Sequence, residues 1–457
     1  MSEWNIKKLS EVADIIGGGT PSSKENAYYE NGTIAWLTPK DLSNHKEMYI
    51  SKGERNITQL GLKNSSAKLL PKGAVLFSSR APIGYVAIAK NTLSTNQGFK
   101  SLILKSGHIP EFYYYLLKNN ISLFEARASG STFKEVSGQV VKDTELKIPD
   151  TETQRNIVKI LKPLDDKITL NTQTNQTLEQ IAQGIFKHWF IDFAPVHAKA
   201  NALARGETIE QAELAAMACL SGKTVEKITA LKTEDPTAYH QLQQTAAAFP
   251  SEFVETEMGQ VPKGWEICSI TDKRVCSIIK PKIHHFSGEK DYIATANVSQ
   301  NTIVGELEKI TFDNRPSRAN MQPIVDSIWF AKMVGEHKAI MIDENDEFLL
   351  KNTILSTGFL GIKPQQYKKC FLYCFINSEN FTLLKNSLAT GAVQIALNNT
   401  SFSSMNIILP SDNVLEYFEN KVSTLFSKIA ASHRENKSLA ETRDLLLPKL
   451  LNGEIEL

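Results

Sequence analysis

The sequence predicts an α+β fold in which two similar α/β domains are separated by an antiparallel pair of long coiled-coil helices, with a pseudo-two-fold internal repeat. Three observations predict it: the two halves of the chain align with each other, each half opens with short β-type runs, and each half closes with a heptad helix. The chain has 457 residues, enough for about three domains at about 150 residues each. Its content of 42% hydrophobic and 22% charged residues is that of a globular protein and excludes disordered and fibrous classes.

The internal repeat appears at an offset of 261 residues. Residues 4–6 (WNI) match residues 265–267 (WEI), and Asn175 matches Asn436. The middle of each half drifts by a few residues, but strings such as QGF and TGF keep their order. Two long units of one design therefore make up the chain.

Five segments follow from this alignment. The connector is rich in Ala and Glu and has no counterpart after the second half. We expect two or three short helices there, packed on the coiled coil, because apolar residues such as Leu214 and Met217 mark a buried face. The segments are a first globular domain (1–150, the first head), a first long helix (151–195), a helical connector (196–260), a second globular domain (261–410, the second head) and a second long helix (411–457).

Each head contains short runs in which Val, Ile, Phe and Tyr alternate with polar residues, and Gly, Pro and Asn mark the bends. Examples are GTIAWLTPKDLSN in the first head and DSIWFAKMVGEHKAIMI in the second. This pattern predicts strands joined by turns. One or two helices interrupt the strands, which indicates an α+β domain.

Apolar residues recur along the two long helices at spacings of four and three, which predicts a coiled coil. Of ten seam positions, eight are apolar in the first helix and seven in the second. Two separate amphipathic helices, each on its own core, are the alternative, and polar seam positions shared at the same offset favour mutual pairing. The seam includes Ile157, Leu161, Leu164, Ile168, Asn175, Leu178 and Ile185, and then Phe418, Val422, Leu425, Ile429, Asn436, Leu439 and Leu446.

The polar seam positions carry information about pairing. Asn171 aligns with Ser432, and Asn175 aligns with Asn436. Polar residues buried in a seam cost stability but specify register and orientation. Antiparallel pairing would place the heads at opposite ends of the helices, an arrangement that suits a target made of two separated half-sites, as in operator-binding dimers.

Prolines bear on the helix ends. Pro163 is expected to kink the first helix or to begin it anew, because proline lacks an amide donor and clashes with the preceding turn. The second helix is expected to stop near Pro448. Residues 163–190 would span about 42 Å as a helix, similar to the separation of about 34–36 Å between half-sites of operator-binding dimers.

The net charge of +1 hides differences between segments. Residues 1–150 carry 19 basic and 14 acidic residues, a net of +5, and residues 261–410 carry 16 and 14, a net of +2. The connector carries 5 and 9, a net of −4. Locally basic surfaces are therefore compatible with a neutral chain. Apolar runs fall short of the roughly 20 residues of a membrane helix, and the N-terminus lacks a signal-peptide core, so we expect a cytoplasmic protein that binds no membrane.

Metal and disulfide chemistry is not expected. The five cysteines are few and odd in number, which argues against a disulfide framework. Cys370 and Cys374 lie in the apolar string FLYCFIN, and this predicts buried thiols. The pair His284–His285 has no evident third ligand, so we predict no metal site.

A nuclease pattern of carboxylates and a lysine is formally present at Asp150 and at Asp165-Asp166-Lys167. Metal-dependent cleavage needs such carboxylates to converge on a cation. Here they lie some 15 residues apart along a predicted helix. No catalytic residue is therefore predicted.

Taken together, several strings resemble those of the specificity subunit of type I restriction–modification systems, the HsdS family. The resemblance covers essentially the whole chain. The second head departs from it, since KPKIHHFSGEKDYIATANVSQ stands where the first head has GGGTPSSKE and WLTPKDLSN. The strings that carry it are WNIKKLSEVADIIGGGTPS, GTIAWLTPKDLSN, LLPKGAVLFSSRAPIGYVAIA, STNQGFKSL, the helix beginning QRNIVKILKPLDDKITLNTQTNQ, and RDLLLPKLLNGEI.

The resemblance implies that the heads are target-recognition domains, each contacting one part of a split sequence in double-stranded DNA. It implies that the helices form the spacer and dock two methyltransferase subunits, which use S-adenosylmethionine, and that two restriction (motor–nuclease) subunits, which use ATP and Mg, complete the complex. The chain itself would hold no cofactor and would be no enzyme. The alternatives are a self-contained restriction endonuclease, active without partners, and a coiled-coil protein–protein adaptor without DNA readout, lacking salt-dependent DNA affinity.

Candidate DNA contacts follow from the chemistry of readout, in which Arg and Lys suit guanine, and Asn and Gln suit adenine. In the first head the loop GGGTPSSK is expected to bring backbone amides close to a phosphate. Arg80, one of three arginines in this head, is the strongest candidate for a base contact, with a surface salt bridge as its alternative. The candidates are Thr20, Ser22, Lys24, Lys40, Ser78, Arg80 and Lys134 in the first head, and Lys280, Lys282, His284, Lys332 and Gln394 in the second.

Overall fold

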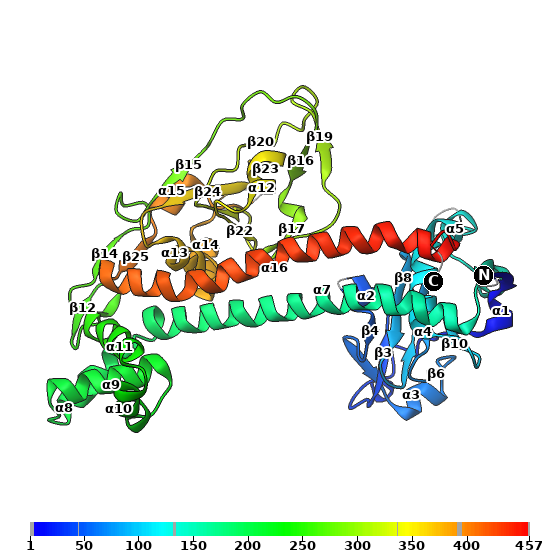
Figure 1. Ribbon diagram of the computed structural model, residues 1–457, viewed down its shortest axis with the longest axis horizontal. Helices are drawn as coiled ribbons and strands as arrows, with labels where there is room; N and C mark the ends of the chain where they lie inside the picture. Colours follow the sequence, from blue (N-terminus) through cyan, green and yellow to red (C-terminus); the bar gives the residue numbers. More distant parts are fainter. Residues whose placement is uncertain (1–3, 44, 131–133, 336, 391–394, 456–457) are drawn as a thin grey trace. The chain divides into compact units, whose positions relative to one another are not determined.

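Figure 1 shows the computed structural model of the chain, which describes residues 4–43, 45–130, 134–335, 337–390 and 395–455. The chain forms two compact units. Unit 1 comprises Met1–Thr174 and Ala431–Leu457, and unit 2 comprises Asn175–Ala430. The two long helices, α7 (Thr151–Phe186) and α16 (Asp412–Asn452), each contribute residues to both units.

The first head lies in unit 1 and contains a five-stranded sheet of order β2-β10-β7-β8-β4, a four-stranded sheet of order β5-β3-β9-β6, and the pair β1-β11. All five residues of β7 are buried, because this strand lies between β10 and β8. The strands are β1 (Asn5–Lys8), β2 (Ala13–Gly17), β3 (Ile34–Leu37), β4 (Tyr49–Ile50), β5 (Arg55–Ile57), β6 (Leu69–Leu70), β7 (Val75–Ser79), β8 (Ile83–Ala89), β9 (Leu93–Thr95), β10 (Lys100–Leu104) and β11 (Glu145–Ile148).

Helix α4 supplies much of the apolar core of the first head. It begins at Pro110, whose fixed φ suits the first turn of a helix, and residues 112–117 (FYYYLL) are all buried. The helices of this head are α1 (Leu9–Val12), the 3₁₀ turn η1 (Asn26–Tyr28), α2 (Pro39–Ser43), α3 (Gln59–Lys63), α4 (Pro110–Asn119), α5 (Ile121–Ala126) and α6 (Gly138–Asp143).

The second head, in unit 2, repeats most of this topology: among the described residues β4 has no counterpart in its sheets, and the pair β17-β18 has no counterpart in the first head. Its sheets have the orders β15-β24-β21-β22 and β19-β16-β23-β20, with the pair β14-β25. The sheets β5-β3-β9-β6 and β19-β16-β23-β20 correspond, and each contains one parallel pair, β3 with β9 in the first head and β16 with β23 in the second. The strands are β14 (Glu266–Ser269), β15 (Cys276–Ile279), β16 (Lys290–Ile293), β17 (Val298–Ser299), β18 (Thr302–Ile303), β19 (Glu308–Ile310), β20 (Ala319–Met321), β21 (Ser327–Ala331), β22 (Ala339–Ile342), β23 (Thr353–Ser356), β24 (Phe359–Pro364) and β25 (Asn406–Leu409). The internal repeat predicted from the sequence is therefore a repeat of the fold.

Three helices of the second head, α13, α14 and α15, occupy the places in chain order of α4, α5 and α6 in the first head, whereas α12 has no counterpart there among the described residues. Residues 370–376 of α13 are all buried, as is the equivalent run in α4. Cys370 and Cys374 are buried there as free thiols, and burial raises the pKa of both. The helical elements are the 3₁₀ turn η3 (Thr295–Asn297), α12 (Glu347–Asn352), α13 (Lys369–Ile376), α14 (Glu379–Leu388) and α15 (Asn399–Ser403).

The connector holds four helices rather than the two or three expected from the sequence. The extra boundary arises at Asp235-Pro236, where the Asp235 side chain accepts a hydrogen bond from the amide of Ala238 and proline begins the next helix. The elements are the π-helix η2 (Lys187–Ile191), α8 (Ala194–Ala204), α9 (Ile209–Ser221), α10 (Val225–Glu234), α11 (Pro236–Ala248) and the hairpin β12 (Phe253–Thr256) with β13 (Gly259–Pro262).

Within unit 1 the helices α7 and α16 run side by side in opposite directions (Figure 1). Asp165 Oδ1 lies 2.6 Å from Arg443 Nη1, and Asn171 Nδ2 donates to Asn436 Oδ1 over 2.9 Å. The partner number on α16 falls as the number on α7 rises, so this pairing is antiparallel. Asn171 and Asn436 thus bond across the pair, as expected of polar seam residues that set register, whereas both polar side-chain atoms of Asn175 are buried without a hydrogen-bond partner among the described residues.

The end of the first long helix also contacts α16 within unit 2. Phe186 and Trp189, at the end of α7 and in η2, contact Phe418 of α16 with ring centroids 6.3 and 5.8 Å apart. Phe186 also contacts Phe371 of α13, at 5.6 Å. The end of the first helix is therefore part of the core of the second head.

All ten seam positions in each helix are buried or half-buried. A restart at Pro163 is excluded, because α7 continues through this residue as one helix, and a kink there stays a prediction. The second long helix ends at Asn452, four residues after Pro448. A proline inside a helix removes one backbone hydrogen bond. Each proline has a buried leucine two residues away, Leu161 beside Pro163 in α7 and Leu450 beside Pro448 in α16, and these leucines keep the helices packed near the missing hydrogen bonds. Among the described residues, no helix is both long and apolar enough to cross a membrane.

Two leucines of α7 provide a matched test of the core. Leu161 is fully buried against the first head, whereas Leu170 is 58% exposed. Leu161→Ala should lower the free energy of unfolding by about 2–5 kcal/mol, because it leaves a cavity. Leu170→Ala should change it by less than about 0.5 kcal/mol. Denaturant unfolding of the two variants measures this, and similar losses would contradict the packing described.

Candidate nucleic-acid interface

The loop after β2 in the first head presents Thr20, Ser22 and Lys24, all of which are exposed. Its glycines serve a purpose that the sequence did not indicate. A Cβ on Gly18 would lie 2.0 Å from the carbonyl oxygen of Asn96, and one on Gly19 would lie 2.3 Å from the amide nitrogen of Ala67. These glycines therefore allow the loop to pack on the protein's own backbone, where the sequence had suggested approach to a phosphate.

Further bonds fix this loop in place. The indole of Trp36 donates to the carbonyl of Gly19 over 2.9 Å, and the Tyr29 hydroxyl donates to the carbonyl of Pro21 over 2.6 Å. Thr20 also bonds to the side chain of Gln97. The exposed side chains of the loop thus rest on a well-anchored backbone.

Two candidates of the first head differ from expectation in their surroundings. Ser78 is fully buried, donates to the carbonyl of Pro82 and accepts from the amide of Tyr85. Its prediction as a DNA contact is therefore wrong: it stabilises the turn between β7 and β8. Lys40 is exposed and pairs with Glu54 over 3.0 Å. Such an exposed ion pair contributes little to the stability of the fold.

Arg80 directly follows β7 and forms an ion pair with Glu135, which was the alternative to a base contact. Arg80 Nη1 is 3.4 Å from Glu135, and Lys100 Nζ is 3.2 Å from the other carboxylate oxygen. One carboxylate thus neutralises part of the charge of two cations. Lys134, next in the chain to Glu135, is exposed.

The turn 96–98 brings these candidates to one region of the first head. Gln97 contacts Thr20 of the loop, and the Gly98 carbonyl accepts the amide of Ser79 over 2.7 Å, next to Arg80. Sequence reasoning did not select this turn, nor Glu135 and Lys100. Their connection depends on strand pairing between distant segments.

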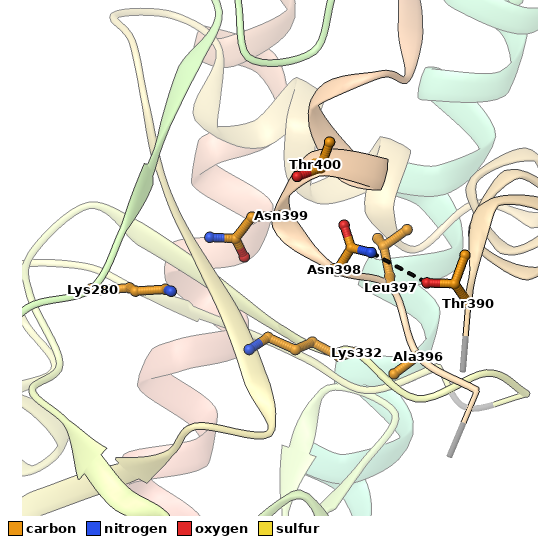
Figure 2. A pocket seen from close by; sticks show the side chains of 8 residues that line it. All are labelled: Lys280, Lys332, Thr390, Ala396, Leu397, Asn398, Asn399 and Thr400. Atoms are coloured by element: carbon orange, nitrogen blue, oxygen red, sulfur yellow. Dashed lines mark hydrogen bonds between the residues drawn. The ribbon is translucent and has the colours of Figure 1, made fainter. Parts of the chain in front are cut away.

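In the second head, Lys280 and Lys332 line a hollow of about 540 Å³ (Figure 2). Lys332 Nζ donates to the carbonyl of Thr357 over 2.9 Å. Burial and the nearby charge of Lys280 lower the pKa of Lys332. The hollow is lined by Lys280, Lys332, Thr390, Ala396, Leu397, Asn398, Asn399 and Thr400.

The remaining candidates of the second head are not gathered there. Lys282 and His284 are exposed on the segment after β15, outside the set that lines the hollow. Gln394 lies outside the described residues. The sequence did not single out Asn398 and Asn399, because they reach the hollow only when the segment 396–400 folds beside Lys332.

The carboxylates of the formal nuclease pattern have structural partners. Asp150 accepts hydrogen bonds from the amide and hydroxyl of Thr153 at the start of α7, and these bonds lower its pKa. Asp165 pairs with Arg443 and accepts from the hydroxyl of Tyr115 over 2.6 Å. In the part of the chain that the structure describes, no three His, Cys, Asp or Glu side chains are grouped as metal ligands.

The role of Ser78 can be tested by stability. Ser78→Ala should lower the free energy of unfolding by about 1–3 kcal/mol, because it leaves the amide of the half-buried Tyr85 without its acceptor. Ser23→Ala, at an exposed position of the same head, should change it by less than about 0.5 kcal/mol. Thermal or denaturant unfolding decides; equal stability of the two variants would show that the Ser78 hydroxyl is not needed in the turn.

Comparison with known proteins gives both partial and full-length matches. A family profile described as "Type I restriction modification DNA specificity domain" matches residues 1–180. The chain is 31% identical over 503 aligned residues to the Type I restriction enzyme HindI specificity subunit of Haemophilus influenzae, with all of both chains covered. It is also 31% identical over 475 residues to the Type I restriction enzyme MjaIX specificity subunit of Methanocaldococcus jannaschii, covering 99% of this chain and 94% of that one.

A solved structure supports the fold. The crystal structure of a Type-I restriction-modification system S subunit from M. genitalium superposes with a TM-score of 0.51 at 15% identity, covering 98% of this chain and 96% of that one. This structural similarity supports the fold alone, whereas the 31% sequence identity over nearly whole chains shows membership of the family. The chain therefore belongs to the family of type I restriction enzyme specificity subunits.

Proposed function

We propose that the chain is the sequence-specific DNA-binding subunit of a type I restriction–modification complex and that it reads a target in two parts. The observation that carries this proposal is the repeated topology: the two heads share the order of four strands in each of their two main sheets but differ in the residues that they expose. A shared scaffold with different surfaces suits two half-sites of different sequence. Membership of the specificity-subunit family supports the same conclusion.

In this proposal the first head contacts DNA through the anchored loop with Thr20, Ser22 and Lys24, through Arg80, and through Lys134. All of these side chains are exposed or half-buried. Phosphate contacts by lysines would fix the head on the duplex, and side chains that reach base edges would supply specificity. Glu135 would hold the guanidinium of Arg80 in one orientation.

The second head contacts DNA through the segment after β15, with Lys280, Lys282 and His284, and through Lys332. The first three are exposed, and Lys332 is half-buried. None of these four residues aligns with a charged residue of the first head, so the two heads would contact DNA through different side chains.

The chain is proposed to supply no chemistry. Two methyltransferase subunits would bring S-adenosylmethionine, and two motor–nuclease subunits would bring ATP and Mg, in a complex that acts in the cytoplasm. Apolar side chains left exposed on the long helices offer surface for docking these partners. They include Leu170 (58% exposed) and Leu445 (69%) in unit 1 and Ile181 (46%) in unit 2.

The test is to co-express the chain with its methyltransferase partner and to map methylated adenines on genomic DNA. The expected result is a motif of two short parts separated by unread base pairs. Exchanging residues 1–150 for the first head of a relative should change one part only, and exchanging 261–410 should change the other. A contiguous motif, or both parts changing with one exchange, would contradict the proposal.

The same experiment separates the alternatives. A self-contained endonuclease would cleave DNA without the partner subunits. A protein–protein adaptor would show no DNA affinity that falls with increasing salt, whereas phosphate contacts make log affinity fall linearly with log salt concentration.

A further inference from the structure

The two heads differ in charge at one equivalent place. In the first head, the backbone of Glu135 forms bridges to Arg80 and Ser129. In the second head, Ala396 forms the matching bridges to Met333 and Thr390. Ala396 therefore stands where the first head has its carboxylate.

The neighbouring hydrogen bonds confirm this equivalence. The amide of Val136 donates to the carbonyl of Ser79 over 2.9 Å, and the amide of Leu397 donates to the carbonyl of Lys332 over 2.9 Å. Lys332 thus occupies the position of the buried, neutral Ser79. By the same bridges Met333 stands in place of Arg80, so the second head has lost the Arg80–Glu135 ion pair and has gained the cation of Lys332.

The consequence is a hollow with uncompensated positive charge. Among the eight described residues that line it, two are lysines and none is acidic. Figure 2 shows the amino groups of Lys280 and Lys332 turned toward the same space, beside the amide of Asn399. The carbonyl of Thr357 holds the Lys332 amino group in place.

The local electrostatics favour an anion there. Burial and the charge of Lys280 lower the pKa of Lys332, since both disfavour its ammonium form. An anion between the two amino groups would offset this repulsion. Lysine binds phosphate as a compact point charge, whereas planar bidentate recognition of a base suits arginine.

We propose that this hollow is a phosphate-binding site through which the second head binds the DNA backbone. In the first head the negative charge of Glu135 at the equivalent place would repel a phosphate, so no such site forms there. The inference rests on the proposed function, because it takes the phosphate to be that of the DNA target. Lys280 and Lys332 supply the charge, and Asn399 and Thr400 supply neutral donors at the edge. The contact would add affinity without sequence preference.

Two variants test the site in opposite ways. Lys332→Met removes one charge and keeps the length of the side chain, and Ala396→Glu introduces the carboxylate of the first head. Lys273→Met is the matched control, since Lys273 is exposed before β15 and Lys280 follows the same strand. Each full-length variant is purified with its methyltransferase partner, and thermal unfolding confirms that it is folded.

Affinity is measured against salt on a duplex that contains the target mapped for the wild type and on a scrambled duplex. For Lys332→Met and Ala396→Glu we expect the slope of log affinity against log salt to become shallower by about one. Affinity should fall by the same factor on both duplexes, with the methylated motif unchanged. Lys273→Met should change the slope by less than half as much.

Two results would overturn the proposal. A loss confined to the target duplex, or a changed methylation motif, would show that Lys332 contacts a base. Unchanged slopes in both variants would place the hollow away from DNA. Failure of the proposed function would be seen in the wild type itself, as absence of salt-dependent affinity or of a bipartite motif.

Discussion

Burial of the helix ends within the heads is the constraint on which this fold depends. In unit 1, Leu450 and Leu451 near the end of the chain are buried in the core of the first head, with Leu161 of α7. In unit 2, Phe186 and Trp189 from the end of the first long helix are buried in the core of the second head. Neither head completes its core from its own segment of sequence, and fully burying one such side chain contributes about 1.5–3 kcal/mol. The course of both helices follows from this requirement.

Function can vary on this scaffold because the core and the exposed loops use different residues. The two heads share the order of four strands in each main sheet, yet Glu135 of the first head is replaced by Ala396, and Ser79 by Lys332. A change from an ion-paired carboxylate to a hollow with two lysines alters which ligand group fits there without altering strand pairing. Two heads of one design can therefore recognise two different half-sites, as the family membership of the chain suggests.

The sequence predicted the features that repeat along it. The offset of 261 residues, the heptad seam and the buried Cys370 and Cys374 all depend on local periodicity or on similarity between halves. The features that it missed depend on distant segments. Ser78 follows an apolar run and was expected to be exposed, but β7 is an inner strand and is buried throughout. The pairing of Glu135 with Lys100 likewise requires the folded sheet.

The antiparallel pairing of the long helices can be tested most directly by a disulfide across the seam. Asn171 Nδ2 lies 2.9 Å from Asn436 Oδ1, so Asn171→Cys with Asn436→Cys should form an intramolecular disulfide in the native full-length chain under mild oxidation. Leu170→Cys with Asn436→Cys, which moves the first thiol to the exposed side of α7, should stay reduced. Peptide mapping without reductant detects the bond. If the first pair fails to close in folded protein, or the second closes as readily, the pairing described here is contradicted.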